Sequence, residues 1–177
     1  PASFNPQVVT DAPSYNASAI ALYNKLLEFE VGTTNQVPAL AESYTISKDE
    51  KTYTFKLRKG VKFHSTKYFK PTRDLNADDV IFSINRQRLK DHPFHNVSNA
   101  AYTQYNNNIK DNILDIKALD PYTVVITLKE IQATFLGYLS GNYMVILSAE
   151  YADQLTKTNN KQQMDLLPIG TGPFKYV

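Results

Sequence analysis

The chain has 177 residues, of which 42% are hydrophobic and 20% charged, a composition that favours a folded domain with a sizeable core over a disordered chain. Its formal net charge of +2 is small and spread along the sequence, so we expect no nucleic-acid partner. It has no cysteine, which excludes disulfides and thiolate metal sites, and no run of about 18 apolar residues, so we expect no transmembrane segment. The sequence opens at Pro1 without a methionine or a signal peptide, and we expect either a mature, processed protein or part of a longer one.

The first half of the chain predicts a helix, a hairpin and a second helix. Apolar residues recur at helical spacing over Ser14–Leu27, with Ser14 as the N-cap. Alternating apolar residues in Glu42–Ser47 and Thr52–Leu57, joined by a polar turn, predict two paired strands. Asn76 precedes two acidic residues and an apolar stripe, which predicts a helix capped at that position.

The second half begins with a segment of weak periodicity. Residues 92–108 are polar and aromatic and predict an ordered loop. Ile113–Leu119 and Tyr122–Leu128 alternate around an Asp-Pro pair and predict a second hairpin.

Shorter elements follow towards the end of the chain. Gln132–Leu139 and Ala149–Leu155 predict short helices, the second capped by Ser148, and Met144–Leu147 predicts a buried strand. Hairpins and helices that do not alternate strictly argue for an α/β fold of the mixed α+β kind, with hairpins and short helices, and against a doubly wound sheet.

No arrangement of residues predicts catalysis or a metal site. His92 and His95 are three residues apart, but Pro93 between them breaks any helix that would align them, and no third ligand is suitably spaced. The chain has no nucleophile elbow. The acids at 78–79 are explained by the helix dipole, and Gly170–Gly172 predicts a tight corner and not a phosphate cradle. We therefore expect a protein that is not an enzyme.

Five stretches of the chain form a recognisable series: Asn5–Pro6 with Leu22–Glu28, Leu40–Ser43, Lys51–His64, Pro71–Val80 and Pro168–Phe174. Taken in this order, they resemble the periplasmic peptide-binding proteins of ABC importers, the solute-binding proteins of family 5. Within that family, the residues ending at Thr34 and Arg73 resemble the dipeptide- and haem-binding branch, while the antimicrobial-peptide receptor branch shares much of the same sequence.

The resemblance implies a fold, a function and a location. The family fold has two α/β lobes joined by a hinge (class II), and residues 1–177 resemble the N-terminal portion of lobe I, with the second lobe and the C-terminal return absent. The implied protein is the periplasmic substrate-binding component of a peptide ABC transporter, which captures short peptides by hinge closure and docks on an inner-membrane permease. A receptor for haem or a haem conjugate, an antimicrobial-peptide receptor and a stand-alone interaction module remain alternatives.

The resemblance also implies ligand contacts. The loop before the first helix would face the ligand, with Thr10 aligned to the contact position; its alternative role is to cap that helix. Tyr102 and Tyr105 resemble a cleft-lining region, and their alternative role is packing within a loop. No cofactor is implied, although haem could be a ligand, held by His64, His95 or a tyrosine. The predicted loop residues are Thr10, Asp11, Ala12, Pro13, Ser14 and Tyr15.

Overall fold

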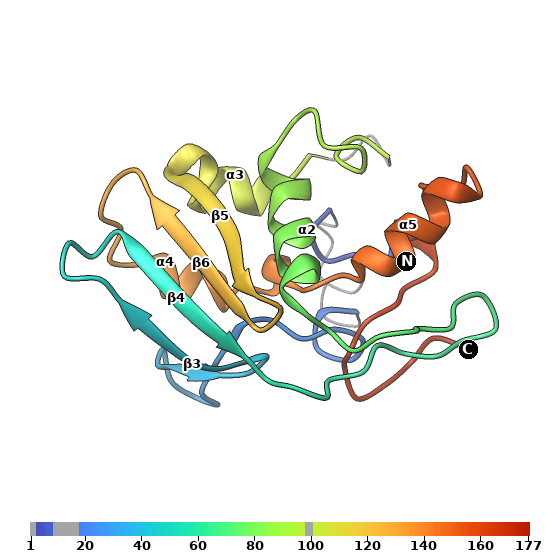
Figure 1. Ribbon diagram of the computed structural model, residues 1–177, viewed down its shortest axis with the longest axis horizontal. Coiled ribbons are helices and arrows are strands. Elements are labelled where there is room, and N and C mark those ends of the chain that lie inside the picture. The colour runs from blue at the N-terminus through green and yellow to red at the C-terminus, as the bar shows by residue number, and fades with distance from the viewer. Residues whose placement is uncertain (1–2, 9–17, 98–100) are drawn as a thin grey trace.

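A four-stranded antiparallel sheet occupies one side of the molecule in a computed structural model that describes residues 3–8, 18–97 and 101–177 (Figure 1). Its strands are β3 (Ala41–Ile46), β4 (Thr52–Leu57), β5 (Ile113–Asp120) and β6 (Thr123–Leu128), in the order β3-β4-β6-β5. The two hairpins predicted from alternation are therefore confirmed. They join into one sheet because β4 pairs with β6, whose central residues are almost all buried.

The helix α2 (Ala77–Arg88) lies between the sheet and the helix α5 (Ala149–Lys157) in Figure 1. Its N-terminus is the one predicted: the Asn76 side chain accepts from the Asp78 N–H, and the Asp79 carboxylate accepts from the Asn76 N–H, which is a capping box. α5 begins after Ser148, whose hydroxyl accepts from the Tyr151 N–H, and this cap is also confirmed.

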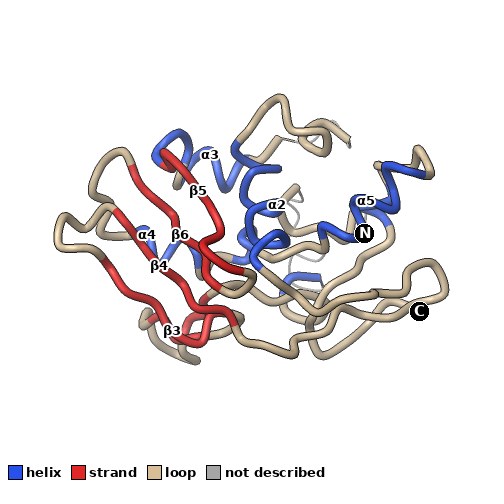
Figure 2. Tube along the Cα trace, viewed as in Figure 1, coloured by secondary structure: helices blue, strands red, loops and turns tan. Residues whose placement is uncertain are grey.

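Shorter elements lie around this frame, and much of the half opposite the sheet is loop (Figure 2). A small hairpin pairs β1 (Leu27–Phe29) with β2 (Gln36–Pro38). The remaining helical elements are α3 (Thr103–Asn108), the 3₁₀ turns η1 (Lys110–Asn112) and η2 (Asn142–Met144), α4 (Phe135–Leu139) and α6 (Gln163–Leu166).

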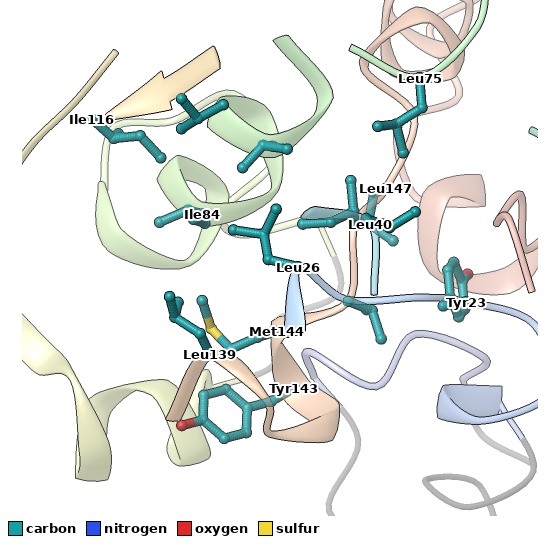
Figure 3. Close-up of a cluster of buried hydrophobic side chains, with 14 of the residues drawn as sticks. Tyr23, Leu26, Leu40, Leu75, Ile84, Ile116, Leu139, Tyr143, Met144 and Leu147 are labelled. Carbon is teal, nitrogen blue, oxygen red and sulfur yellow. The ribbon is translucent and has the colours of Figure 1, made fainter. Parts of the chain in front are cut away.

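One apolar core joins these elements, and Figure 3 shows part of it. Ile84 of α2 faces Ile116 of β5 and the side chains of the irregular segments between the regular elements. Burial of this area from water is the main favourable term for the fold. The labelled residues in the close-up are Tyr23, Leu26, Leu40, Leu75, Ile84, Ile116, Leu139, Tyr143, Met144 and Leu147.

The predicted helix over Ser14–Leu27 is wrong in its second half. Residues 14–17 lie outside the described residues; Ser18 and Ala19 are helical, a turn covers 20–22, and Leu27 already belongs to β1. The apolar residues in this stretch do not form one buried helix face, because Ile20 is 65% exposed while Leu22 and Leu27 are buried, and the backbone here runs beside other segments. The Leu22 carbonyl accepts from the Gly172 N–H at 3.0 Å, and the Asn24 carbonyl accepts from the Ile146 N–H at 2.9 Å.

Two other predictions need correction. Met144–Leu147 is buried as expected, but it is not a strand: η2 ends at Met144 and no ladder follows it. The loop predicted over 92–108 contains the helix α3, a short stretch of Thr, Gln, Tyr and Asn whose composition gives little helical signal. The short helix predicted over Gln132–Leu139 is present but begins later, at Phe135.

Candidate functional site

Of the predicted ligand-contacting residues, the structure describes two and leaves six outside the described residues. Thr10, Asp11, Ala12, Pro13, Ser14 and Tyr15 lie outside the described residues, so their role stays a prediction. The residues on either side of that stretch, Val8 and Ser18, are both buried. Tyr102 and Tyr105 are described, and each is 1% exposed, so neither side chain reaches the surface of this chain.

A buried ion pair joins the helices α2 and α6. Nη2 of Arg86, near the end of α2, donates to both carboxylate oxygens of Asp165 in α6, at 2.7 and 2.9 Å. Arg86 is 0% and Asp165 1% exposed. Two charged groups removed from water in this way need each other, because either one alone would be a buried, uncompensated charge.

The N-terminal segment is attached to this ion pair. Asn5 Nδ2 donates to Asp165 Oδ1 at 2.6 Å, while Asn5 Oδ1 accepts from the Gln7 N–H at 3.0 Å. The Phe4 N–H and the Ser3 hydroxyl both donate to the Asp165 carbonyl, each at 2.9 Å. The polar side chain of Asn5, itself 0% exposed, thus links a buried carboxylate to the backbone two residues before Val9.

The region of Tyr102 is attached to the same ion pair. Arg86 Nε donates to the Phe94 carbonyl at 3.0 Å, and His95 Nδ1 donates to the Arg86 carbonyl at 2.7 Å. The Tyr102 hydroxyl donates to the His95 carbonyl at 2.8 Å, and the Arg86 guanidinium lies 6.0 Å from the Tyr102 ring centre. We call Asn5, Arg86, His95, Tyr102 and Asp165 the buried polar cluster.

The electrostatics of the buried polar cluster keep Arg86 charged. Burial by itself lowers the pKa of Arg86, but the Asp165 carboxylate and the Tyr102 hydroxyl outweigh it, so this pKa is raised. Burial raises the pKa of Tyr102, against the opposing effect of Arg86, so the phenol stays neutral. The cluster is therefore a fixed charge pair with a neutral hydroxyl beside it.

Tyr105 differs from Tyr102 in its hydrogen bonding. Its buried hydroxyl has no hydrogen-bond partner among the residues that the structure describes, and burial raises its pKa. The two tyrosines are thus not brought together as one polar surface; Tyr102 belongs to the buried polar cluster and Tyr105 to the core. Their burial favours the packing alternative, and a ligand contact by either one stays a prediction.

The two glycines of the segment Gly170–Phe174 have a structural explanation. A Cβ on Gly172 would lie 2.6 Å from the Ala21 carbonyl oxygen, and one on Gly170 would overlap the Leu22 carbonyl oxygen. His64 holds the same segment, because its N–H donates to the Gly170 carbonyl at 2.9 Å and its Nε2 to the Gly172 carbonyl at 2.8 Å. The glycines allow two backbones to pass closely, and one histidine stabilises the contact.

No metal site is present in the described part of the chain, where no three His, Cys, Asp or Glu side chains lie close enough to hold an ion. His92 Nδ1 accepts from the Phe94 N–H at 3.2 Å, and His95 Nδ1 and His64 Nε2 are engaged with carbonyls. Each histidine thus has a structural partner, and haem ligation by His64 or His95 is untested. Among the described helices, none is long and apolar enough to cross a membrane.

Sequence reasoning missed three members of the buried polar cluster. Asn5 belongs only to one of the stretches that carry the family resemblance, and Arg86 has no role in the expectations above. Asp165 carries no local signal at all, because its partners lie 79 and 160 residues away in the chain. The one sequence signal for Arg86 is its position, because a charged residue there falls on the face of the helix that carries the apolar residues.

Comparison with known proteins places the chain in a family. Residues 35–177 match the model of the family described as bacterial extracellular solute-binding proteins, family 5 Middle. The chain belongs to this family. The mixed α/β fold expected for part of a two-lobed periplasmic-binding protein is thereby confirmed.

Individual relatives are similar over nearly the whole chain. It is 48% identical over 176 residues to the dipeptide-binding protein of Escherichia coli K12, which covers 99% of this chain and 33% of that protein. It is 47% identical over 178 residues to heme-binding protein A of Haemophilus influenzae, covering 100% of this chain and 32% of that one.

A solved structure is similar as well. The dipeptide-binding protein of Pseudoalteromonas sp. SM9913, in complex with Met-Leu, superposes with a TM-score of 0.95 at 40% identity, covering 99% of this chain and 35% of that one. The chain spans about a third of the length of the relatives that it matches.

Proposed function

We propose that this chain is the N-terminal portion of the first lobe of a longer receptor that captures short peptides for an ABC importer. The observation that carries the proposal is the similarity over 99% of the chain, at a TM-score of 0.95, to a dipeptide-binding protein solved with Met-Leu. The 48% identity to a second dipeptide-binding protein supports the same ligand class.

The proposed mechanism is capture without a chemical step. Thr10–Tyr15 contact the peptide through backbone and short polar groups, which gives affinity without strong preference for a sequence. The charges that recognise the peptide termini come from a second lobe outside this chain, and the hinge closes when both lobes hold the ligand. The closed receptor, in the periplasm, then docks on a membrane permease.

A haem receptor on the same scaffold is the second candidate. The observation that favours it is the 47% identity to heme-binding protein A, which nearly equals the identity to the dipeptide-binding protein. The two ligands differ in how they are detected, because haem bound by a protein shifts its Soret absorption and a dipeptide has no such band.

Thermal unfolding of the full-length receptor tests the peptide proposal. A ligand that binds only the folded state raises the midpoint of unfolding as its concentration exceeds its Kd. We expect Met-Leu to raise it and an equimolar mixture of free methionine and leucine to leave it unchanged. An equal response to the free amino acids, or none to Met-Leu, would contradict dipeptide capture.

The isolated chain provides a second test, which concerns how much each lobe contributes to ligand affinity. If the second lobe supplies the decisive charges, the 177-residue chain binds Met-Leu at least 100-fold more weakly than the full-length receptor, by the loss of two charged contacts. Equal affinities would show that the ligand is held by this chain alone.

A further inference from the structure

The strand β3 is an edge of the four-stranded sheet, and among the described strands it pairs only with β4 (Figure 1). The Ser47 N–H donates to the Thr52 carbonyl at 2.9 Å, so the odd-numbered residues of this stretch turn their backbone groups towards β4. The N–H and C=O groups of Tyr44 and Ile46 therefore point outwards, where no described strand pairs with them. These two residues can accept another strand.

The opposite edge strand, β5, is protected against such pairing. Two irregularities interrupt its register with β6, and Nη1 of Arg88 donates to the carbonyls of Ile113 and Leu114, at 3.2 and 3.4 Å. Bulges and covering groups are devices by which natural sheets protect their edges. The one irregularity in β3 lies between Ala41 and Ser43, ahead of the residues that point outwards. In the described sheet, residues 43–47 thus form a regular and open edge.

Apolar side chains on this edge are incompletely covered. Tyr44 lies beside Phe55, with ring centres 5.9 Å apart, and Ile46 lies opposite Tyr53. Phe55 and Tyr53 are buried, whereas Ile46 is 44% exposed and Tyr44 is half-buried. A hollow of about 510 Å³, lined in part by Ile46, Tyr53 and Leu136, borders the edge. The apolar face of the sheet therefore ends at β3 with surface that another strand would remove from water.

The charges along this edge are complementary to those of a second copy. In an antiparallel pair of β3 strands centred on Thr45, the exposed Glu42 of one copy lies opposite the exposed Lys48 of the other. In the same register Tyr44 lies opposite Ile46, and both turn their backbone groups towards the other strand, so the two residues can exchange hydrogen bonds. Backbone bonding, apolar contact and charge thus agree on one register.

We propose that two copies of this protein associate through β3, as an antiparallel pair with Thr45 on the two-fold axis. The inference goes beyond peptide capture and does not depend on the identity of the ligand. Each copy uses the same surface, so the contact closes as a dimer and does not propagate into a filament. The ion pairs at its ends are exposed, so association should weaken as the ionic strength rises.

A disulfide across the two-fold axis tests the register in the full-length receptor. Residues that face each other without exchanging backbone bonds have Cα atoms about 4.5 Å apart, a separation that a disulfide can span. Thr45→Cys should therefore form a covalent dimer on mild oxidation. Ser43→Cys, exposed on the same face of the strand, is the control, because its symmetry mate lies at least about 13 Å away along the strand. The unmodified receptor, oxidised in parallel, reports cross-links made elsewhere.

Charge reversal tests the ion pairs by sedimentation velocity at low ionic strength. The unmodified receptor should pass from monomer to dimer as its concentration rises. Glu42→Lys or Lys48→Glu places like charges opposite each other at both ends of the contact, and each should raise the dimer Kd about tenfold or more. A mixture of the two variants restores opposite charges at both ends, so it should form a mixed dimer where neither variant pairs with itself.

The outcomes separate this interface from any other. A receptor that stays monomeric at every concentration and gives no covalent dimer with Thr45→Cys would overturn the proposal. Equal cross-linking of Thr45→Cys and Ser43→Cys, or dimers that ignore both charge reversals, would place self-association on another surface and overturn it as well. Met-Leu titration of the same samples tests peptide capture separately, so the failure of one proposal is distinguishable from the failure of the other.

Discussion

The carboxylate of Asp79 accepts a hydrogen bond from the backbone N–H of Ala149, 70 residues later in the chain, at 2.8 Å. The same carboxylate closes the capping box with Asn76 and pairs with Arg73. One side chain therefore fixes the beginning of α2 and the beginning of α5 relative to each other. A local helix signal thus also serves as a long-range contact.

Removal of the Asp79 charge should lower the free energy of unfolding more than removal of an ordinary acidic charge in the first turn of a helix. We expect Asp79→Asn to lower the free energy of unfolding by about 2 kcal/mol, because it leaves Arg73 without its counter-ion; Arg73 is partly exposed, so the cost is below that of a fully buried pair. Urea unfolding measures it. Asp78→Asn, on the exposed side of the same turn, should cost less than about 1 kcal/mol. Equal costs would contradict the long-range role.

The close approach at Gly172 predicts a second stability effect. Gly172→Ala places a Cβ 2.6 Å from the Ala21 carbonyl oxygen, a backbone atom that cannot move alone, and should cost about 2 kcal/mol or more. Gly137→Ala is the control, since its Cβ would meet only Gln36 Nε2 at 3.8 Å in a helix. Its effect should be stabilising, by up to about 1 kcal/mol. A neutral Gly172→Ala would argue against the backbone contact.

The two buried tyrosines should respond differently to loss of the hydroxyl. Tyr102→Phe removes the bond to the His95 carbonyl and should cost about 1 kcal/mol of unfolding free energy. Tyr105→Phe removes a buried hydroxyl that has no described partner, so stability should stay the same or rise. Thermal unfolding of both variants checks this. A destabilised Tyr105→Phe would reveal a partner for that hydroxyl.

His92 predicts a pH dependence of stability. Burial, and next the nearby Arg86 charge, lower its pKa from 6.5 to about 4. The folded state therefore disfavours the protonated imidazole, so this contribution to stability is complete above pH 6.5 and is lost progressively as the pH falls towards 4. His92→Asn, whose amide oxygen can accept the Phe94 N–H bond, should flatten the profile in that window. Parallel profiles for the two proteins would rule out this role.

Thr10 carries a prediction about the ligand. In the full-length receptor, Thr10→Val should weaken Met-Leu binding by about 1 kcal/mol, roughly fivefold, through the loss of one hydrogen bond. Calorimetric titration measures it. Unchanged affinity would contradict a ligand contact by Thr10.

The parts of the fold that sequence reasoning predicted are those fixed by local patterns. Alternation over Thr52–Leu57 predicted β4 because one face of that strand is buried. Asn76 predicted the start of α2 because a capping box needs only four residues.

The parts that sequence reasoning missed depend on distant segments. The backbone around Leu22 bonds to the distant Gly172, and its helix-like spacing is no sign of a helix face, since Ile20 is exposed. Val145 and Leu147 are as apolar as strand residues, yet only Ile146 between them bonds to the Asn24 carbonyl, so no ladder forms.

The candidate site divides in the same way. The family resemblance indicated Thr10 and Tyr102, because a resemblance can be recognised from residues that are neighbours in the sequence. The pair Arg86–Asp165 could not be predicted, because neither residue has a local reason to be buried and each is stable there only with the other.

Calorimetric titration of the full-length receptor, with Met-Leu and separately with haem, tests the central claim most directly. Peptide capture predicts saturable heat with one Met-Leu per receptor and none with haem. Haem binding with no response to Met-Leu would contradict it and assign this scaffold to haem uptake.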